Sequence, residues 1–195
     1  MSEILPLLSN IRQCRLCEAH LPLGPRPVLQ AGSSARILIA GQAPGRKVHA
    51  SGQPFTDASG DRLRDWLGLS TDIFYDAARV AIVPMGFCYP GTGPSGDLAP
   101  RPECAPHWRA QVLQALPKLQ LTLAIGQYAQ AYHLAGPSRS VTQAVQDSHV
   151  HWPHLVALPH PSPRNNRWLR LNPWFEAELL PALKLRVATV LADTS

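Results

Sequence analysis

The sequence predicts an α/β protein with three layers, in which helices flank a central parallel sheet of four strands. Four short apolar runs, at residues 36–40, 80–83, 121–125 and 154–158, are nearly continuous, which is typical of strands buried on both faces. Apolar residues at helical spacing separate or follow these runs. Strands that alternate with helices form parallel sheets with right-handed crossovers, so this order of segments indicates the fold class.

Each predicted strand is built from β-branched or aliphatic residues, such as Ile-Leu-Ile at 37–39 and Leu-Val-Ala-Leu at 155–158. Helices are expected at residues 61–67, 106–116, 127–134 and 173–187. The last of these begins with Asn172 as its cap and Pro173 in its first turn. All four strands end in turns rich in Gly or Pro, at residues 41–45, 84–86, 126–127 and 159–162. Ligands of open α/β sheets bind beyond the carboxyl ends of the strands, so we expect the functional site at that edge.

Composition indicates a globular protein with a basic surface. The 195 residues, with 45 % apolar content and neither a repeat nor a long linker, fit one domain over residues 1–195. No apolar stretch approaches the length of a membrane span, and no signal peptide is recognisable, so we expect a cytoplasmic protein and take a monomer as the working expectation. The net charge of +5, carried mostly by arginine, favours a polyanionic partner, although an arginine-rich composition alone would also produce it.

The cysteines predict a metal centre. Cys14 and Cys17 form a Cys-x-x-Cys pair, whereas Cys88 and Cys104 flank a loop rich in Pro and Gly. A cytosolic protein keeps its thiols reduced, so four spaced cysteines indicate ligands rather than disulfides. All-thiolate ligation suits an iron–sulfur cluster, and the single Cys-x-x-Cys makes structural zinc less favoured. Zinc and unliganded core cysteines both remain open alternatives.

Three short motifs, together with the cysteines, carry a resemblance to a known family. Gly-Gln-Ala-Pro-Gly at 41–45, Gly-Gln-Pro-Phe at 52–55 and His-Pro-Ser at 160–162 resemble motif A, the base-stacking loop and motif B of the uracil-DNA glycosylase superfamily. The cysteine spacing is similar to that of its iron–sulfur branch, family 4. Residues 160–165 look more like motif B of the single-strand-selective monofunctional glycosylases. The resemblance covers residues 14–168 and implies the fold of that superfamily, a structural 4Fe–4S cluster and DNA as the partner.

The resemblance also implies roles for individual residues. His160 would donate a hydrogen bond to the base as a neutral imidazole, and Phe55 would stack on the base, although either could be purely structural. Beyond them, residues 163–168 would enter the duplex or hold phosphates, unless they form an ordinary basic loop. We expect catalysis from Gln42, His160 and Asp57, substrate binding from Gly41, Ala43, Pro44, Phe55, Pro84 and Ser162, and DNA contacts from Arg46, Lys47, Arg164, Asn165 and Arg167.

Two positions depart from the pattern of the iron–sulfur branch. Gln42 stands where that branch has an acid, and an amide can orient a water but cannot take its proton. Ala43, where other branches place an amide, cannot replace it, so the nearby Asp57 and Asp61 are candidates, with helix capping or solvent exposure as the alternative for each. Pro84 stands where an asparagine would read the base, so the preferred base can differ from uracil.

These observations predict a monofunctional DNA glycosylase that removes uracil or another deaminated or damaged base. Water would be the nucleophile, since neither motif core contains a lysine, and Lys47 just past motif A is the residue to check. No histidine occurs at residues 89–103, which argues against a covalent histidine adduct. The alternatives are a non-catalytic DNA-binding homologue with a structural cluster and a redox-sensing cluster protein.

Overall fold

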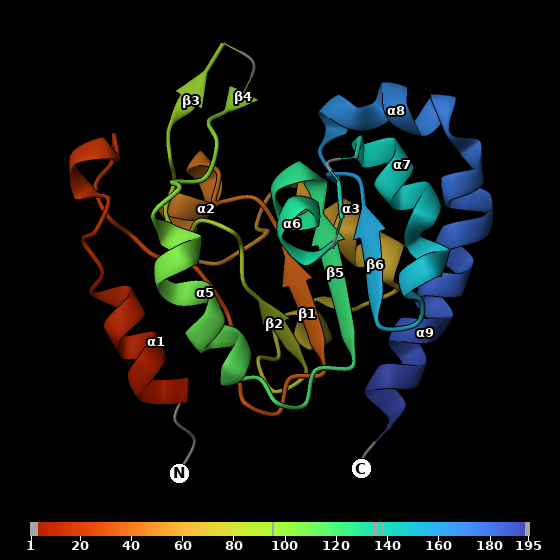
Figure 1. The fold of residues 1–195 in the computed structure, drawn as a ribbon, viewed down its shortest axis with the longest axis horizontal. Coiled ribbons are helices and arrows are strands. Elements are labelled where there is room, and N and C mark those ends of the chain that lie inside the picture. The colour runs from red at the N-terminus through yellow and green to blue at the C-terminus, as the bar shows by residue number, and fades with distance from the viewer. Residues whose placement is uncertain (1–3, 95, 135, 138, 194–195) are drawn as a thin grey trace.

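The centre of the fold is a parallel sheet of four strands in the order β2–β1–β5–β6 (Figure 1). The computed structural model describes residues 4–94, 96–134, 136–137 and 139–193. The strands are β1 (Ile37–Ala40), β2 (Val80–Ile82), β5 (Leu121–Ile125) and β6 (Leu155–Leu158). In the register of the sheet, Ile39 of β1 lies opposite Ile82 on one side and Leu123 on the other. The predicted fold class is therefore confirmed.

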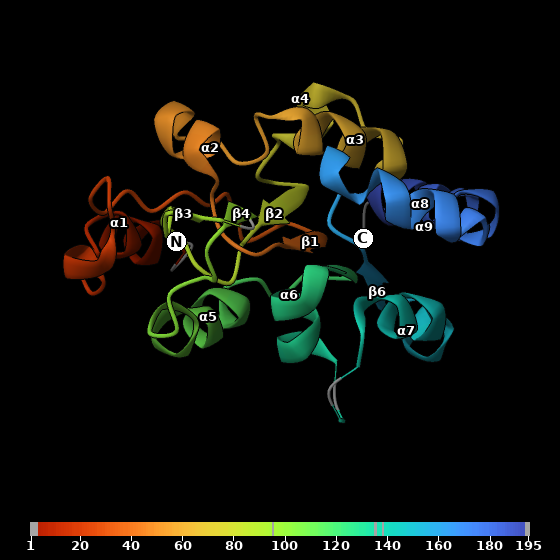
Figure 2. The ribbon, with the colours of Figure 1, turned by 90° about the horizontal axis from the view of Figure 1, so that it is seen from above.

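Helices cover both faces of the sheet, which makes the fold three layers deep (Figure 2). They are α1 (Ile4–Arg12), α2 (Arg46–Ser51), α3 (Ala58–Leu67), α4 (Thr71–Phe74), α5 (Cys104–Gln114), α6 (Gly126–His133), α7 (Val141–Gln146), α8 (Asn166–Leu171) and α9 (Leu180–Ala192). Seen from above, α2, α3, α4, α8 and α9 lie on one side of the strands, with α5, α6 and α7 on the other. A π-helical turn, Phe175–Leu179, leads into α9, and α1 packs beside α5. No helix in the described ranges is long and apolar enough to cross a lipid bilayer.

The apolar runs form strands here because both faces of each strand are covered. Along β1, Ile37 and Ile39 pack into the cluster that includes α3 and α9, whereas Leu38 between them packs toward α1 and α5. All three side chains are fully buried. Alternate residues of a strand point to opposite faces, so a strand covered on both sides needs an unbroken apolar run.

The structure differs from the predicted elements at helix ends and in short segments. Helix α3 begins at Ala58 because Asp57 caps it by accepting a hydrogen bond from the Gly60 N–H. Asn172 does not cap the last helix with its side chain, which instead donates to the Trp168 carbonyl at the end of α8. Helices α1, α2, α4, α7 and α8 and the hairpin of β3 (Thr92–Gly93) and β4 (Gly96–Asp97) were not predicted. Most of these are too short to show a hydrophobic period.

One tight backbone contact fixes the loop that leads into α3. A Cβ added to Gly60 would lie 1.8 Å from the Phe55 carbonyl oxygen, which no side chain can accommodate without movement of the backbone. Phe55 itself has a φ of 56°, in the left-handed region that non-glycine residues rarely occupy. The Tyr75 hydroxyl lies 3.0 Å from both the Pro54 and the Phe55 carbonyl oxygens and helps to hold this conformation.

We predict that Gly60→Ala destabilises the protein by more than about 2 kcal/mol, because the new methyl group overlaps backbone atoms. Chemical denaturation of the purified variant measures the effect. Gly24→Ala is the control: unlike Gly60, Gly24 has a positive φ, but nothing lies within 4 Å of the added Cβ, so only the conformational penalty of about 1–2 kcal/mol applies. Equal losses in the two variants would contradict the steric explanation.

Candidate active site

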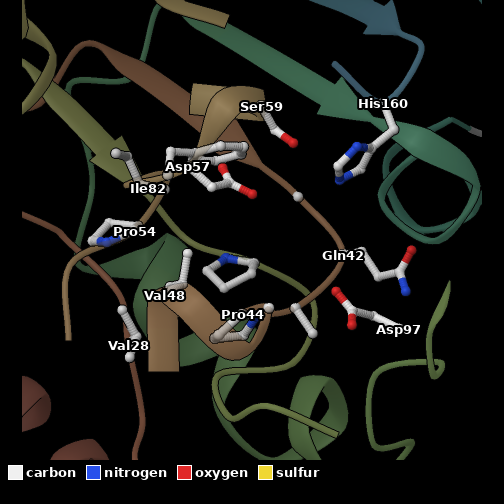
Figure 3. Close-up of a pocket in the computed structure, with 15 residues that line it drawn as sticks. Val28, Gln42, Pro44, Val48, Pro54, Asp57, Ser59, Ile82, Asp97 and His160 are labelled. Carbon is white, nitrogen blue, oxygen red and sulfur yellow. The ribbon is translucent and has the colours of Figure 1, made fainter. Parts of the chain in front are cut away.

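A pocket opens at the carboxyl edge of the sheet, where the turns after β1, β2 and β6 meet (Figure 3). Its volume of about 80 Å³ is several times the roughly 10–15 Å³ that one water requires. The walls also include residues from α3 and from the β3–β4 hairpin. Eight predicted site residues line it: Gly41, Gln42, Ala43, Pro44, Phe55, Asp57, Pro84 and His160.

His160 stands two residues beyond β6, and its ring is held in one orientation. The Ser162 N–H donates to His160 Nδ1 at 3.2 Å, and the Asn165 side chain donates to the His160 carbonyl at 2.7 Å. In a neutral imidazole, if Nδ1 accepts a hydrogen bond, the proton is on Nε2, and Nε2 is then a hydrogen-bond donor. Burial lowers the pKa of His160, while the nearby Asp57 and Asp97 act in the opposite direction. The geometry therefore favours a neutral imidazole that donates through Nε2.

Phe55 lies against the motif-A turn. A Cβ on Gly41 would lie 3.6 Å from the Phe55 ring, which is ordinary van der Waals contact, so the ring packs directly against this turn. On its other side, Phe55 makes an edge contact with Phe74, with the ring centroids 6.1 Å apart. The ring is half-buried rather than sealed in the core and forms part of the pocket wall.

Two carboxylates and one amide surround the pocket beside His160. Asp57 lines it while capping α3, so the capping role does not exclude a chemical one. Asp97, which sequence reasoning missed, enters from β4, and its Oδ1 accepts a hydrogen bond from the Thr92 hydroxyl. Gln42 Nε2 donates to the Leu98 carbonyl at 3.0 Å, which ties motif A to the hairpin. Asp61 is exposed and paired with Arg64, and it does not line the pocket.

Pro84 forms part of the wall with no free polar group. Its carbonyl accepts a hydrogen bond from buried Arg109, which also donates to the Val83 carbonyl. Arg109 Nη2 lies 2.6 Å from His133 Nε2, and the guanidinium stacks over Tyr132. Burial lowers the pKa of His133 to about 4, with Arg109 adding to the shift.

Two serines near the pocket have different environments. Ser162, expected to bind substrate, does not line the pocket; its N–H holds His160, and its hydroxyl accepts from the Arg164 N–H. Its carbonyl accepts from Arg62, which also bonds Asn166. Ser59, which was not predicted, is buried and lines the pocket. The run Asp57-Ala58-Ser59-Gly60, which begins two residues after Phe55, contains no periodic pattern that would have located it.

The predicted DNA-contact residues lie around this edge of the molecule. Arg46 and Lys47 are exposed in the first turn of α2, and Arg167 is exposed on α8. Arg164 is exposed and packs on the β3–β4 hairpin, where a Cβ on Gly96 would meet its Nη1. Lys47 is not among the residues that line the pocket.

All four cysteines line a second pocket, between the segment after α1, the segment after β2 and the start of α5. Two of the sulfurs accept hydrogen bonds: the Trp108 indole N–H donates to Cys14, and the Phe87 backbone N–H donates to Cys104. Burial raises the pKa of Cys88 to about 11 and that of Cys104 to about 12. Across the described ranges, no group of three or more His, Cys, Asp or Glu side chains is spaced to hold a metal ion.

Comparison with known proteins assigns the family. The family model described as the Uracil DNA glycosylase superfamily matches residues 29–184, and the chain therefore belongs to this superfamily. A solution NMR structure from Methanosarcina acetivorans, named only provisionally as a uracil DNA glycosylase, matches over 82 % of this chain and 98 % of its own, with 16 % identity and a TM-score of 0.48.

Two partly buried histidines predict acid sensitivity. The folded pKa values of His133 and His160 lie below the unfolded value of about 6.5, so the unfolded chain binds more protons below that pH. Their contribution to stability is complete above pH 6.5 and is lost as the pH falls toward 4. We expect the thermal midpoint of His133→Asn, which keeps an acceptor for Arg109, to fall less steeply over this range than that of the wild type. Exposed His154→Asn is the control, and an unchanged slope in His133→Asn would contradict the assignment.

Proposed function

We propose that this protein is a monofunctional DNA glycosylase that hydrolyses the N-glycosidic bond of uracil or another deaminated or damaged base. Membership of the superfamily supports the reaction class. The observation that carries the proposal is the orientation of His160, whose Nδ1 accepts the Ser162 N–H and leaves Nε2 to donate into the pocket. A fixed neutral donor at this place suits a leaving group on which negative charge develops.

Residues that line the pocket have distinct roles in the proposed reaction. Phe55 offers an aromatic face on which a flipped base can stack. Bond cleavage builds positive charge on the sugar and negative charge on the departing base, and the His160 N–H stabilises the latter. A carboxylate at the pocket orients the attacking water and takes its proton, which the amide of Gln42 cannot do. Lys47 is outside the pocket, in agreement with water as the nucleophile.

We assign the role of orienting and deprotonating the attacking water to Asp57 in preference to Gln42. Its carboxylate lines the pocket and is the larger of two acidic influences on His160, the other being Asp97. The Gln42 amide nitrogen, by contrast, is engaged by the Leu98 carbonyl. The exposed cations Arg46, Lys47 and Arg167 would hold the phosphates on either side of the flipped nucleotide.

Glycosylase activity is tested with single- and double-stranded oligonucleotides that carry uracil, hypoxanthine or xanthine, followed by alkaline cleavage of abasic sites. We expect His160→Ala to lower the single-turnover rate by about 10²–10³-fold, as loss of a positioned donor does, with little change in DNA affinity. Asp57→Asn should lower it by about 10²–10⁴-fold while keeping helix α3, because asparagine caps as well as aspartate. Asp97→Asn should lower the single-turnover rate less than Asp57→Asn does.

His154→Ala is the matched control for the histidine, because His154 is exposed just before β6, at the far end of that strand from the pocket. It should retain the wild-type rate. If the wild type cleaves none of these substrates yet binds DNA, the chain is the non-catalytic homologue. If His160→Ala loses binding and turnover equally, His160 is structural.

We further propose that the four cysteines hold a structural 4Fe–4S cluster. Four thiols that share one pocket and two N–H groups that donate to sulfur fit an iron–sulfur centre. A single zinc ion would require all four sulfurs within about 2.3 Å of one point. The described cysteines are not spaced in that way. Cys14 and Cys17 would come from the end of α1, and Cys88 and Cys104 from the two ends of the hairpin loop.

Anaerobic purification tests the cluster. The wild type should be brown, with absorbance near about 400 nm, and Cys104→Ser should lose most of this absorbance. Trp108→Phe is the control, because it removes only the donor to Cys14; it should keep the absorbance and shift the reduction potential. Colourless protein with one zinc per chain would establish the zinc alternative instead.

A further inference from the structure

Ser59 is a buried residue whose hydroxyl group faces the pocket without a protein partner. It is the second residue of α3 and only 6 % exposed. Its hydroxyl makes no hydrogen bond to any residue in the described part of the chain. In Figure 3 its oxygen is turned toward the side on which His160 stands. The hydroxyl oxygen is not among the fully buried polar atoms that lack a partner, so it is reachable from the pocket and is free to bond a group that enters there.

The other buried serine shows the contrast. Ser148 is 3 % exposed, and its hydroxyl donates to the Ala144 and Ala157 carbonyls and accepts from the Ala157 N–H. That side chain serves the fold and has its partners within it. Ser59 has none, so its hydroxyl is available to a molecule that enters the pocket.

The position of Ser59 relative to the proposed base is fixed by its neighbours. Gly60, the next residue, is packed against the Phe55 backbone, so Ser59 stands beside the stacking residue. His160 lines the same pocket. Pro84 lines it too, but has no N–H and has its carbonyl engaged by Arg109. Besides Gln42, whose amide nitrogen donates to the Leu98 carbonyl, Ser59 and His160 are the neutral polar side chains of the described pocket wall that can pair with the edge of a base stacked on Phe55.

We propose that Ser59 hydrogen-bonds the ring N–H of the flipped base while His160 donates to the adjacent carbonyl. This inference rests on the proposed glycosylase function and defines its substrate class. Deamination replaces an amino group by a carbonyl and places an N–H beside it, in uracil, hypoxanthine and xanthine alike. A serine hydroxyl rotates and can accept from that N–H in each case, whereas cytosine and adenine present an amino group to the His160 donor. The two groups therefore select the carbonyl and N–H pair, which thymine and guanine also carry, against the amino-bearing edges of cytosine and adenine.

Ser59→Ala tests the proposal through three measurements. The single-turnover rate on uracil- and hypoxanthine-containing oligonucleotides should fall about tenfold, as expected for one lost hydrogen bond. Affinity for an oligonucleotide with an abasic site should be unchanged, since that ligand has no base edge. The thermal midpoint without DNA should stay the same or rise, because the hydroxyl removed has no protein partner.

Ser34→Ala is the matched control, because Ser34 is remote from the pocket and its hydroxyl bonds the Ala78 carbonyl. Ser59→Cys keeps a side chain of similar size with a weaker donor and acceptor. Its single-turnover rate should lie between those of the wild type and Ser59→Ala. A wild-type rate in Ser59→Ala overturns the proposal and leaves the glycosylase intact. A parallel loss of stability, abasic-site binding and rate overturns it in favour of a structural role. A wild type inactive on every base overturns the proposed function and this inference together.

Discussion

The backbone ladder between β1 and the segment after β2 continues past both strands, and the pocket depends on this continuation. The Met85 N–H donates to the Gly41 carbonyl and the Gly86 N–H to the Gln42 carbonyl, each at 2.9 Å. Motif A is thereby held to the chain around Pro84 as firmly as two strands are held to each other. Parallel strands end at one edge, so the same alignment brings the turn after β6, with His160, to this wall.

Most polar groups around the pocket are anchored by other parts of the protein. Asn165 and Ser162 fix His160, Thr92 holds Asp97, and the N-terminus of α3 holds Asp57. Such anchoring reduces the reorganisation needed when charge develops on a substrate, which is the usual source of rate in enzymes of this kind. The chemistry proposed for the pocket thus follows from hydrogen bonds that already exist in the free protein.

The fold and part of the site could be predicted from the sequence, since both depend on local patterns. The apolar runs identified all four strands, and the turns after them contain His160 and the motif-A residues that line the pocket. Ser59 and Asp97 could not be found in this way. Ser59 reaches the pocket through the tight packing of Gly60 on Phe55, and Asp97 through a hairpin with strands of two residues each. Such contacts link segments that are distant in sequence or depend on backbone conformation. Periodic patterns of apolar residues carry no information about them.

The loop between Cys88 and Cys104 belongs to two sites at once. Its ends carry two of the four cysteines, while its middle supplies Asp97 to the pocket. The Leu98 carbonyl, also in the middle, accepts a hydrogen bond from the Gln42 amide. A change at Cys88 or Cys104 would therefore act on the same loop that places Asp97 and Leu98 beside motif A, so the cysteine site and the shape of the pocket would not vary independently.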